Sequence, residues 1–209
     1  MAEIKLTKNE LRAQQRRLAQ LEKYLPTLQL KKAMLQTEVQ KARQDIQELQ
    51  EELDRIRTRV EASSSLLSES TSVDPLQVAQ VQAIDKHYEN YAGVEVPIFN
   101  GVTFAPLSYS LVDTPPWMDA MVLGLRDIAQ SKVKVSVAEE KKAALERELR
   151  EVSIRVNLFE KILIPRANEN IRHIRVFLGD QELAAVARAK VAKGKIEASR
   201  SDDLEGLCV

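Results

Sequence analysis

The chain has 209 residues, 30% of them charged, and its 31 Lys and Arg balance its 31 Asp and Glu. This balance argues against a general polyanion-binding protein, and the aromatic content of only 4% argues against a compact mixed fold. The lone Cys208 excludes an internal disulfide, stands too close to the C-terminus for prenylation, and favours a reducing compartment. The longest uncharged run, 96–112, contains Pro97 and Pro106 and does not predict a membrane span, and the first residues lack the pattern of a secretory signal.

The first predicted element is a long helix that begins near Thr7. Thr7 and Glu10 form the T-x-x-E pattern of a capping box, in which each side chain satisfies a free amide of the first turn. From Leu11 onward, apolar residues return at alternating intervals of three and four, as in a helix that buries one seam in a coiled coil. The pattern runs to about Glu69, and we interpret Pro26 as a local kink. The principal seam residues are Leu18, Leu21, Leu25, Leu28 and Leu35.

The middle of the chain has a different composition. No glycine precedes Gly93, and most aromatic residues lie between Tyr88 and Trp117. Alternation of apolar and polar residues over 94–98 predicts a strand, which pairs with the segment 81–88 in a hairpin. The apolar residues that alternate along the second strand are Val94, Val96 and Ile98. We expect this hairpin to stand off the helices while needing their support, because isolated hairpins are marginally stable.

Two positions compete for the hairpin turn. Asn100-Gly101 is the stronger local turn signal. A turn near Glu89-Asn90 pairs the two better strand candidates instead. Pro97 lacks an amide proton and confines its strand to an edge.

A second long helix is predicted from Thr114, as N-cap, and Pro115, at the first helical position. Its apolar residues also alternate by four and three from Leu145 onward. Around Pro165 the pattern gains one residue, a skip that locally unwinds a coiled coil. The principal seam residues here are Leu149, Val152, Val156, Phe159 and Leu163.

Two seamed helices joined by a short middle segment are expected to pack antiparallel. The predicted fold class is therefore all-α dominated: a long antiparallel two-helix coiled coil with a small central β-hairpin head. We expect an N-terminal helix in 1–70, the head in 71–113, a C-terminal helix in 114–200 and a flexible tail in 201–209.

Charge is sorted along the chain. Residues 1–32 carry eight Lys and Arg against three Asp and Glu, whereas 63–125 carry one against seven. The antiparallel arrangement brings the basic segments of both helices to one tip, where they contact an acidic partner or simply solvate a helix end. The candidate contacts, which we expect to lie close together, are Arg12, Arg16, Arg17, Arg188, Lys190 and Lys193.

No catalytic, cofactor or metal site is predicted. The glycines are isolated and form no phosphate loop, His87 and His173 have no cysteine near them, and the serines 63–65 have no neighbouring base. A stiff helical chain without such chemistry points to a mechanical or scaffolding role.

The segment RVNLFEKILIPRANENIRHIR (155–175) resembles the C-terminal helix of the D subunit of V/A-type rotary ATPases. LTKNELRAQQRRLAQLEKY (6–24) is similar to that family's N-terminal helix, VEVPIF (94–99) to its second hairpin strand and TPP (114–116) to the start of its second helix. The chain departs from the family at Pro26 and the residues after it, where the family generally has a glycine and a Leu-Leu-Lys-x-Lys stretch, and at Ala167, where leucine is frequent.

The resemblance implies a central rotor shaft that couples ATP hydrolysis or synthesis to translocation of protons or sodium ions. Such a subunit is not catalytic and carries no cofactor. Its implied partners are the catalytic and regulatory subunits of the ATPase ring, a small F subunit and a socket subunit of the membrane rotor, with no nucleic acid and no direct membrane insertion. Hairpin residues 94, 96 and 98 are further candidate contacts. The implied location is cytoplasmic, peripheral to the membrane, and the resemblance favours the turn near Glu89-Asn90.

Two alternatives come from other classes of protein. A prefoldin-like coiled-coil chaperone subunit also has two helices joined by hairpins, but the termini of this chain are basic rather than apolar. A basic-zipper DNA-binding protein is disfavoured because the second long helix should occupy the seam of the first.

Overall fold

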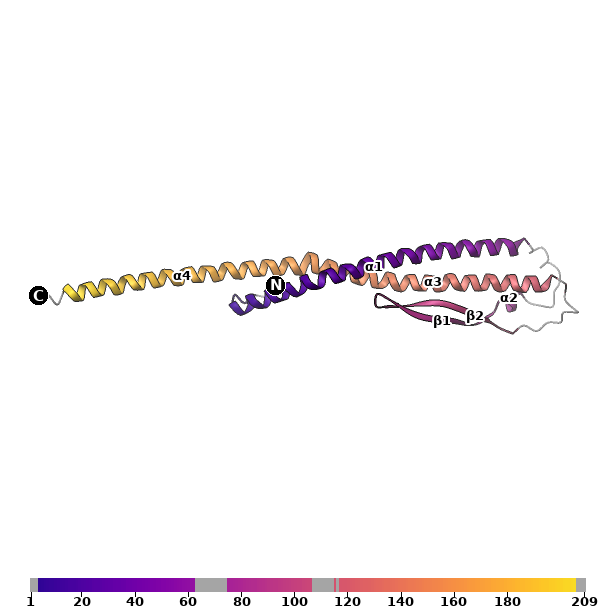
Figure 1. The fold of residues 1–209 in the computed structure, drawn as a ribbon, viewed down its shortest axis with the longest axis horizontal. Coiled ribbons are helices and arrows are strands. Elements are labelled where there is room, and N and C mark those ends of the chain that lie inside the picture. The colour runs from indigo at the N-terminus through magenta and orange to yellow at the C-terminus, as the bar shows by residue number, and fades with distance from the viewer. Residues whose placement is uncertain (1–3, 63–74, 107–114, 116, 206–209) are drawn as a thin grey trace. The chain divides into compact units, whose positions relative to one another are not determined.

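The computed structural model describes residues 4–62, 75–106, 115 and 117–205. It confirms the predicted fold class: along the chain, one long helical stretch precedes a small antiparallel two-stranded sheet and a second long helical stretch follows it (Figure 1). The elements in chain order are α1 (Lys8–Glu61), α2 (Pro75–Val78), β1 (Val81–Tyr91), β2 (Val94–Phe104), α3 (Met118–Leu158), the π-turn η2 (Phe159–Leu163) and α4 (Ile164–Glu205).

Contacts divide the chain into two compact units. The terminal unit comprises residues 1–28 and 155–209, and the central unit comprises 29–154. The terminal unit therefore joins the first turns of α1 to η2 and α4. The central unit contains the rest of α1, the sheet, α2 and α3.

The start of α1 forms half of the predicted capping box. Thr7 Oγ1 accepts a hydrogen bond from the Glu10 amide at 3.2 Å, as expected for an N-cap. The Glu10 carboxylate instead accepts from the side-chain amide of Gln14 at 2.8 Å. Lys8 Nζ lies 3.2 Å from a carboxylate oxygen of Glu182, an exposed pair that places the beginning of α1 beside α4.

Burial in the terminal unit follows the predicted seam. Val156, Ala167, Ile171 and Ile174 are buried, and Ile174 is fully so. The remaining seam residues of this unit are half-buried: Leu18, Leu21, Leu25, Leu28, Phe159 and Leu163. Burial of these positions is what the heptad assignment requires, and the individual cross-helix contacts stay a prediction.

A π-turn stands where the sequence pattern gains a residue. Within η2 the chain makes i→i+5 bonds, and the Ile164 amide donates to the Phe159 carbonyl. A π-turn accommodates one extra residue in a helix without rotating the following turns out of phase. The helix therefore continues through Pro165, and α1 likewise continues through Pro26.

The central unit has its own seam. Along α1 the buried residues are Leu35, Val39, Ala42 and Ile46; along α3 they include Leu145 and Val152, while the predicted seam residue Leu149 is half-buried. Ion pairs join the helices at Lys31–Glu148, 2.7 Å, and at Arg43–Glu146, 2.8 Å. A hydrogen bond from Arg43 is the main cause of the lowered pKa of Glu146.

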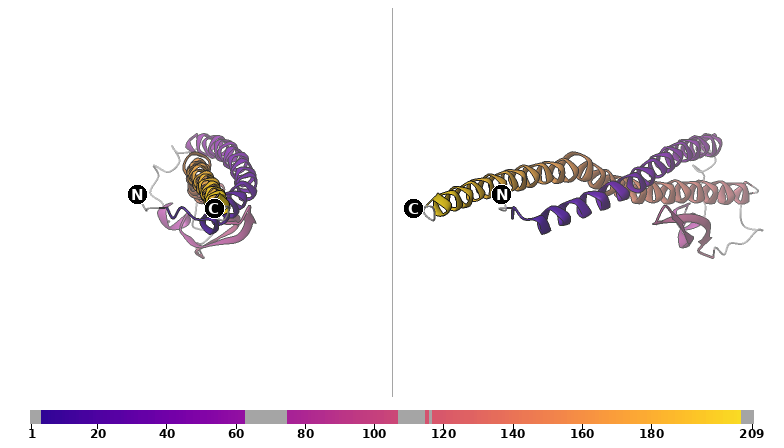
Figure 2. Two further views of the ribbon diagram at one scale, coloured as in Figure 1. Left: turned by 90° about the vertical axis from the view of Figure 1, so that its left-hand side faces the viewer. Right: turned by 60° about the vertical axis from the view of Figure 1, so that its left-hand side comes forward.

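The two central helices approach closely at Gly124. A Cβ atom added there would lie 2.8 Å from Cγ2 of Val60, closer than carbon atoms pack. Lys31 of α1 lies beside Glu148 of α3, and Val60, later in α1, lies beside Gly124, earlier in α3. The two helices are therefore antiparallel. Figures 1 and 2 both show α1 and α3 side by side.

The hairpin turn lies at Ala92-Gly93, two to three residues beyond the position near Glu89-Asn90. Both residues have positive φ, 53° and 82°, as the type I′ turn requires. The Gly93 amide donates to the side chain of Asn90 at 2.8 Å. Asn100-Gly101 is not a turn: Gly101 pairs with Asp85 inside the sheet, and Asn100 is the unpaired residue of a bulge.

The expectation that the hairpin stands off the helices is wrong. Val96 has no exposed surface and Pro97 is also buried, so this part of β2 packs against the rest of the chain. Lys86 of β1 forms an ion pair with Glu140 of α3 at 2.6 Å. The hairpin lies beside α3 in the views of Figures 1 and 2, which explains how a two-stranded sheet is stable.

The helix after the head begins later than predicted. Met118 is the first residue of α3, and its amide bonds to the Pro115 carbonyl at 3.0 Å. Pro115 is therefore in the preceding turn rather than at the first helical position, and Thr114 lies outside the described residues. Val78 of α2 packs with Met118 and Val122 in a small core.

Several of the predicted segment ends lie outside the described residues, and the end of α4 differs from its predicted position. The expected end of the first helix near Glu69 and the limits at 70/71 and 113/114 lie in ranges outside the described residues. α4 reaches Glu205, beyond the expected end at 200. Past Glu182 no described residue of α1 accompanies it, and its large apolar side chains are exposed there: Leu183, Val186, Val191 and Ile196.

We expect Leu35→Asp to lower the free energy of unfolding by roughly 3–5 kcal/mol, because it places a carboxylate in a fully buried site. Chemical denaturation followed by circular dichroism measures the change. Leu30→Asp, at a side chain 63% exposed on the same helix, is the matched control and should cost no more than about 0.5 kcal/mol. Equal denaturation midpoints for Leu35→Asp and the parent would refute the seam.

We expect Ala92→Asn to strengthen the hairpin, because Asn-Gly is the preferred pair for two residues at positive φ. Hydrogen exchange of the β1 and β2 amides should slow by a factor of about two, corresponding to a few tenths of a kcal/mol. Ala92→Val, a β-branched residue at the same position, should speed it. The turn assignment fails if both variants exchange at the parental rate.

Candidate partner-binding surfaces

The first candidate surface is the basic side of the terminal unit. Arg12, Arg16 and Arg17 lie in the first three turns of α1, and all three side chains are exposed. The helix fixes their spacing: residues four apart stand one above the other, and Arg17 is turned by about 100° from Arg16. The three guanidinium groups thus cover more than one face of α1.

The predicted six-residue cluster does not form. The Lys8–Glu182 ion pair fixes the level of α1 against α4. At ~1.5 Å per residue, Arg188 lies roughly 15 Å from the level of Arg12, and Lys193 lies roughly 30 Å from that of Arg17. Arg188, Lys190 and Lys193 are exposed side chains on the part of α4 that extends past the start of α1.

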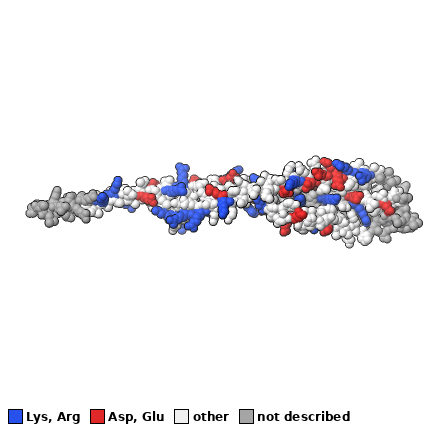
Figure 3. Space-filling view, viewed as in Figure 1, with Lys and Arg blue, Asp and Glu red and all other residues white. Residues whose placement is uncertain are grey.

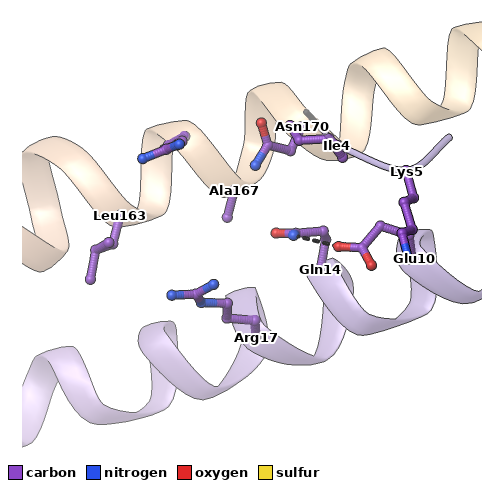
Figure 4. Close-up of a pocket in the computed structure, with 9 residues that line it drawn as sticks. Ile4, Lys5, Glu10, Gln14, Arg17, Leu163, Ala167 and Asn170 are labelled. Carbon is purple, nitrogen blue, oxygen red and sulfur yellow. Dashed lines mark hydrogen bonds between the residues drawn. The ribbon is translucent and has the colours of Figure 1, made fainter. Parts of the chain in front are cut away.

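Other arginines of α4 lie beside α1. A groove of about 440 Å³ lies between the two helices (Figure 4), and its lining includes Arg17 of α1 and Arg166 of α4. Ala167 and Leu163 form its apolar wall, and Asn170 and Gln14 add polar groups. Along the same pair of helices, a second groove of about 360 Å³ includes Arg172 and Arg175.

Sequence reasoning missed these three arginines for one reason. A heptad pattern identifies which face of each helix is buried, but it does not fix the axial offset between two antiparallel helices. Arg166, Arg172 and Arg175 belong to the basic segment 166–200, and only the observed offset brings them beside α1.

Lys and Arg predominate over the terminal unit in Figure 3, whereas Asp and Glu gather over the central unit.

The second candidate surface is the hairpin. Val96 is fully buried by the chain itself, so it is unavailable for direct contact with a partner; Val94 and Ile98 are half-buried. Lys141 Nζ lies 5.4 Å from the centre of the Tyr91 ring, a cation–π contact that fastens the turn end of the hairpin to α3. Arg126 fastens the other end, donating to the carbonyls of Val78 and Ala105, both at 3.3 Å.

A groove of about 490 Å³ runs between β2 and the two central helices. Its apolar lining includes Ile98, Phe99 and Val137. Its charged lining consists of three acidic residues of α1 and two lysines of α3: Asp45, Glu48, Glu52, Lys134 and Lys141. Ile98 is therefore placed at a surface groove, as its assignment as a candidate contact requires.

The exposed face of β1 carries a chain of hydrogen bonds. The Tyr91 hydroxyl donates to the Glu89 carboxylate at 2.9 Å, and His87 Nε2 lies 3.2 Å from its other oxygen. The bond from Tyr91, followed by that from His87, lowers the pKa of Glu89, and the same carboxylate raises the pKa of Tyr91. His87 Nδ1 is 2.6 Å from Oδ1 of the bulge residue Asn100.

These polar groups do not form a metal site. In the described part of the chain, no three His, Cys, Asp or Glu side chains are grouped so that they could hold a metal ion. What the described residues offer is therefore surface for contact: basic grooves in the terminal unit and a mixed groove beside the hairpin.

The family model for the D subunit of ATP synthase matches residues 10–194, which covers both helical stretches and the hairpin. The chain belongs to this D-subunit family. A protein of Chlamydia pneumoniae, named as the D subunit of a V-type ATP synthase, is 45% identical, over 93% of this chain and 94% of the relative. Proteins of the same name from Chlamydia caviae and Chlamydia trachomatis serovar L2 are 42% and 43% identical, over 96% and 94% of this chain and 97% of each relative.

Membership of the D-subunit family makes the chain a component of a V/A-type ATPase and confirms the resemblance. It does not favour the prefoldin-like alternative. The segment 155–175, on which the resemblance chiefly rests, contains the π-turn and the three α4 arginines Arg166, Arg172 and Arg175. Within the described ranges, no helix is both long and apolar enough to cross a membrane.

We expect Tyr91→Phe to raise the pKa of Glu89 toward that of an ordinary glutamate, because the variant lacks the hydroxyl that stabilises the carboxylate. Since the folded-state pKa is lowered, the bond stabilises the hairpin above the unfolded-state pKa and is lost as pH falls through the folded-state value. NMR titration of the Glu89 side chain measures the shift. Tyr88→Phe, at the exposed tyrosine beside the cluster, should leave the titration unchanged.

Proposed function

We propose that this chain is the central rotor shaft of a V-type ATPase or ATP synthase, coupling ATP hydrolysis or synthesis in a catalytic ring to ion translocation through a membrane rotor. The observation that carries the proposal is the family match over 10–194, on a chain whose two ends belong to one antiparallel helical unit. Such a unit presents a slender pair of helices that fits inside a ring. The chain itself is not catalytic in this proposal.

The mechanism requires a shaft that presents different sides to different ring subunits. Two helices have an elongated cross-section, so rotation changes which side chains face each surrounding subunit. Chemistry at each ring site then depends on the angle of the shaft, and differential contact with the ring conformations is what links rotation to turnover. The basic side chains of the terminal unit supply several weak, exposed contacts, which suits a part that must not stop at one angle.

The proposed partners divide between the two units. The basic grooves of the terminal unit suit contact with acidic and polar groups of the catalytic and regulatory ring subunits. The central unit, with its hairpin and mixed groove, remains for the small F subunit and the socket subunit of the membrane rotor. The proposal places the chain in the cytoplasm, peripheral to the membrane as part of this complex, without cofactor or nucleic acid.

We expect the triple reversal Arg12→Glu, Arg16→Glu and Arg17→Glu to impair insertion into the ring, because it replaces attraction to acidic ring groups by repulsion. Single alanine substitutions at the same positions should change ATPase turnover only about twofold or less, in line with exposed ion pairs. Reconstitution with the ring subunits, read by native mass spectrometry and ATPase rate, measures both effects.

The matched control reverses Arg55, Arg57 and Arg59, three exposed basic residues of α1 in the central unit. This control should insert normally, and circular dichroism should show both triple variants folded. The Arg12, Arg16 and Arg17 variant should also still bind the F subunit. Normal insertion and turnover with that variant would show that the basic residues only solvate the helix end.

A further inference from the structure

The π-turn at Phe159–Leu163 coincides with two other irregularities of the same helix. Pro165 follows two residues later and has no amide to give to the carbonyl four residues before it. The seam pattern also gains its extra residue here, stepping four residues from Leu163 to Ala167 where alternation calls for three. Ala167, Ile171 and Ile174 are nevertheless buried, so the π-turn restores the phase of the seam.

The extra residue has a clear structural consequence. In an uninterrupted heptad the residues following Leu163 at the seam would be Arg166, Asn170 and His173. The chain would then bury polar and charged groups without partners, at considerable cost. The π-turn is therefore required for as long as the helix contains the extra residue of the seam pattern.

The opposite helix is weakened at the same level. The Lys8–Glu182 ion pair and the antiparallel direction place residue 26 of α1 opposite about residue 164 of α4. Pro26 lies there, and it likewise deprives a carbonyl of its amide donor. The contacts of the chain divide into two units close by, at 28/29 in α1 and at 154/155 in α3.

We propose that the π-turn η2, Pro165 and Pro26 together form a bending joint of the coiled coil. Bending an α-helix lengthens its backbone hydrogen bonds on one side, and bends occur at prolines and π-bulges, where regular i→i−4 bonds are already missing. Both helices lack such bonds at one level, so bending there disrupts fewer bonds than bending elsewhere. The joint concentrates flexing at one place and leaves the seams on either side intact.

Deletion of Pro165 tests this joint with a one-residue change. The deletion removes the proline and the extra residue together, so that the intervals from Leu145 to Leu178 alternate four and three throughout with the same seam residues. Pro165→Ala is the matched control, because it restores the missing amide but keeps the extra residue and with it the π-turn.

Hydrogen exchange of the full chain gives the first measurement. In the parent, amides 160–164 should exchange about tenfold faster than those of flanking turns, a factor equivalent to about 1.4 kcal/mol of local stability. Deletion of Pro165 should bring these amides to the flanking rate, whereas Pro165→Ala should leave them faster. Parental exchange no faster than that of the flanking turns would overturn the proposal.

Spin-label distances give a second measurement, and its comparison of two label pairs in the parent does not require the deletion variant to fold. Labels at Ala143→Cys and Glu169→Cys, with Cys208→Ser, span the π-turn; labels at Ala33→Cys and Arg59→Cys span regular helix of the same length in α1. Each pair is separated by roughly 39 Å in a straight helix. The first distribution should be distinctly broader, and deletion of Pro165 should narrow it to the width of the second.

Equal widths for the two label pairs in the parent would overturn the joint. A width that Pro165→Ala narrows as fully as the deletion does would overturn its assignment to the π-turn, leaving the proline alone responsible. Neither measurement depends on the ring subunits, so the proposed function and the joint stand or fail separately.

Discussion

Burial of one apolar seam between antiparallel helices is the constraint on which the rest of this structure depends. The seam leucines and valines of each helical stretch are removed from water by the surface of the other stretch. Leu35 on α1 and Leu145 on α3 are both fully buried, whereas most of their neighbours along the chain are half-buried or exposed. Other features adapt to this requirement: a glycine admits a valine where α1 and α3 approach closely, and a π-turn keeps the seam in phase across an extra residue.

The hairpin depends on the same two helices. A two-stranded sheet has too little apolar surface to be stable by itself. Here Val96 provides an inward anchor, while Lys86, Lys141 and Arg126 fasten the strands through charge and ring contacts. The central unit thus combines a rigid helical base with a strand whose outer face is open. The basic terminal unit, by contrast, has helices and little else, and this difference suits two different kinds of partner.

Much of the fold could be predicted from the sequence, because heptad periodicity, the Thr7 cap and the alternation around Val96 are local signals with direct physical meaning. The turn could not, since Ala92 adopts a positive φ that alanine rarely takes and only strand pairing imposes it. Alternation places Val96 on the apolar face of its strand without saying what covers that face, so the sequence alone does not distinguish a partner contact from burial by the chain itself. Arg166 escapes prediction because the axial offset of two antiparallel helices is set by all of their side chains together. The π-turn is visible in the sequence only as an irregular interval in the seam.

The part of α4 past Glu182 affects how readily the unassembled chain is cleaved by proteases and associates with itself. Leu183, Val186 and Val191 lie exposed around a single helix, with basic residues such as Arg188 and Lys190 between them. A single helix unfolds locally at little cost, and proteases that cleave after lysine and arginine act on such transient openings. The exposed apolar side chains also promote self-association. We therefore expect an unassembled copy to be degraded faster than an assembled one, because binding partners that enclose this helix would protect it.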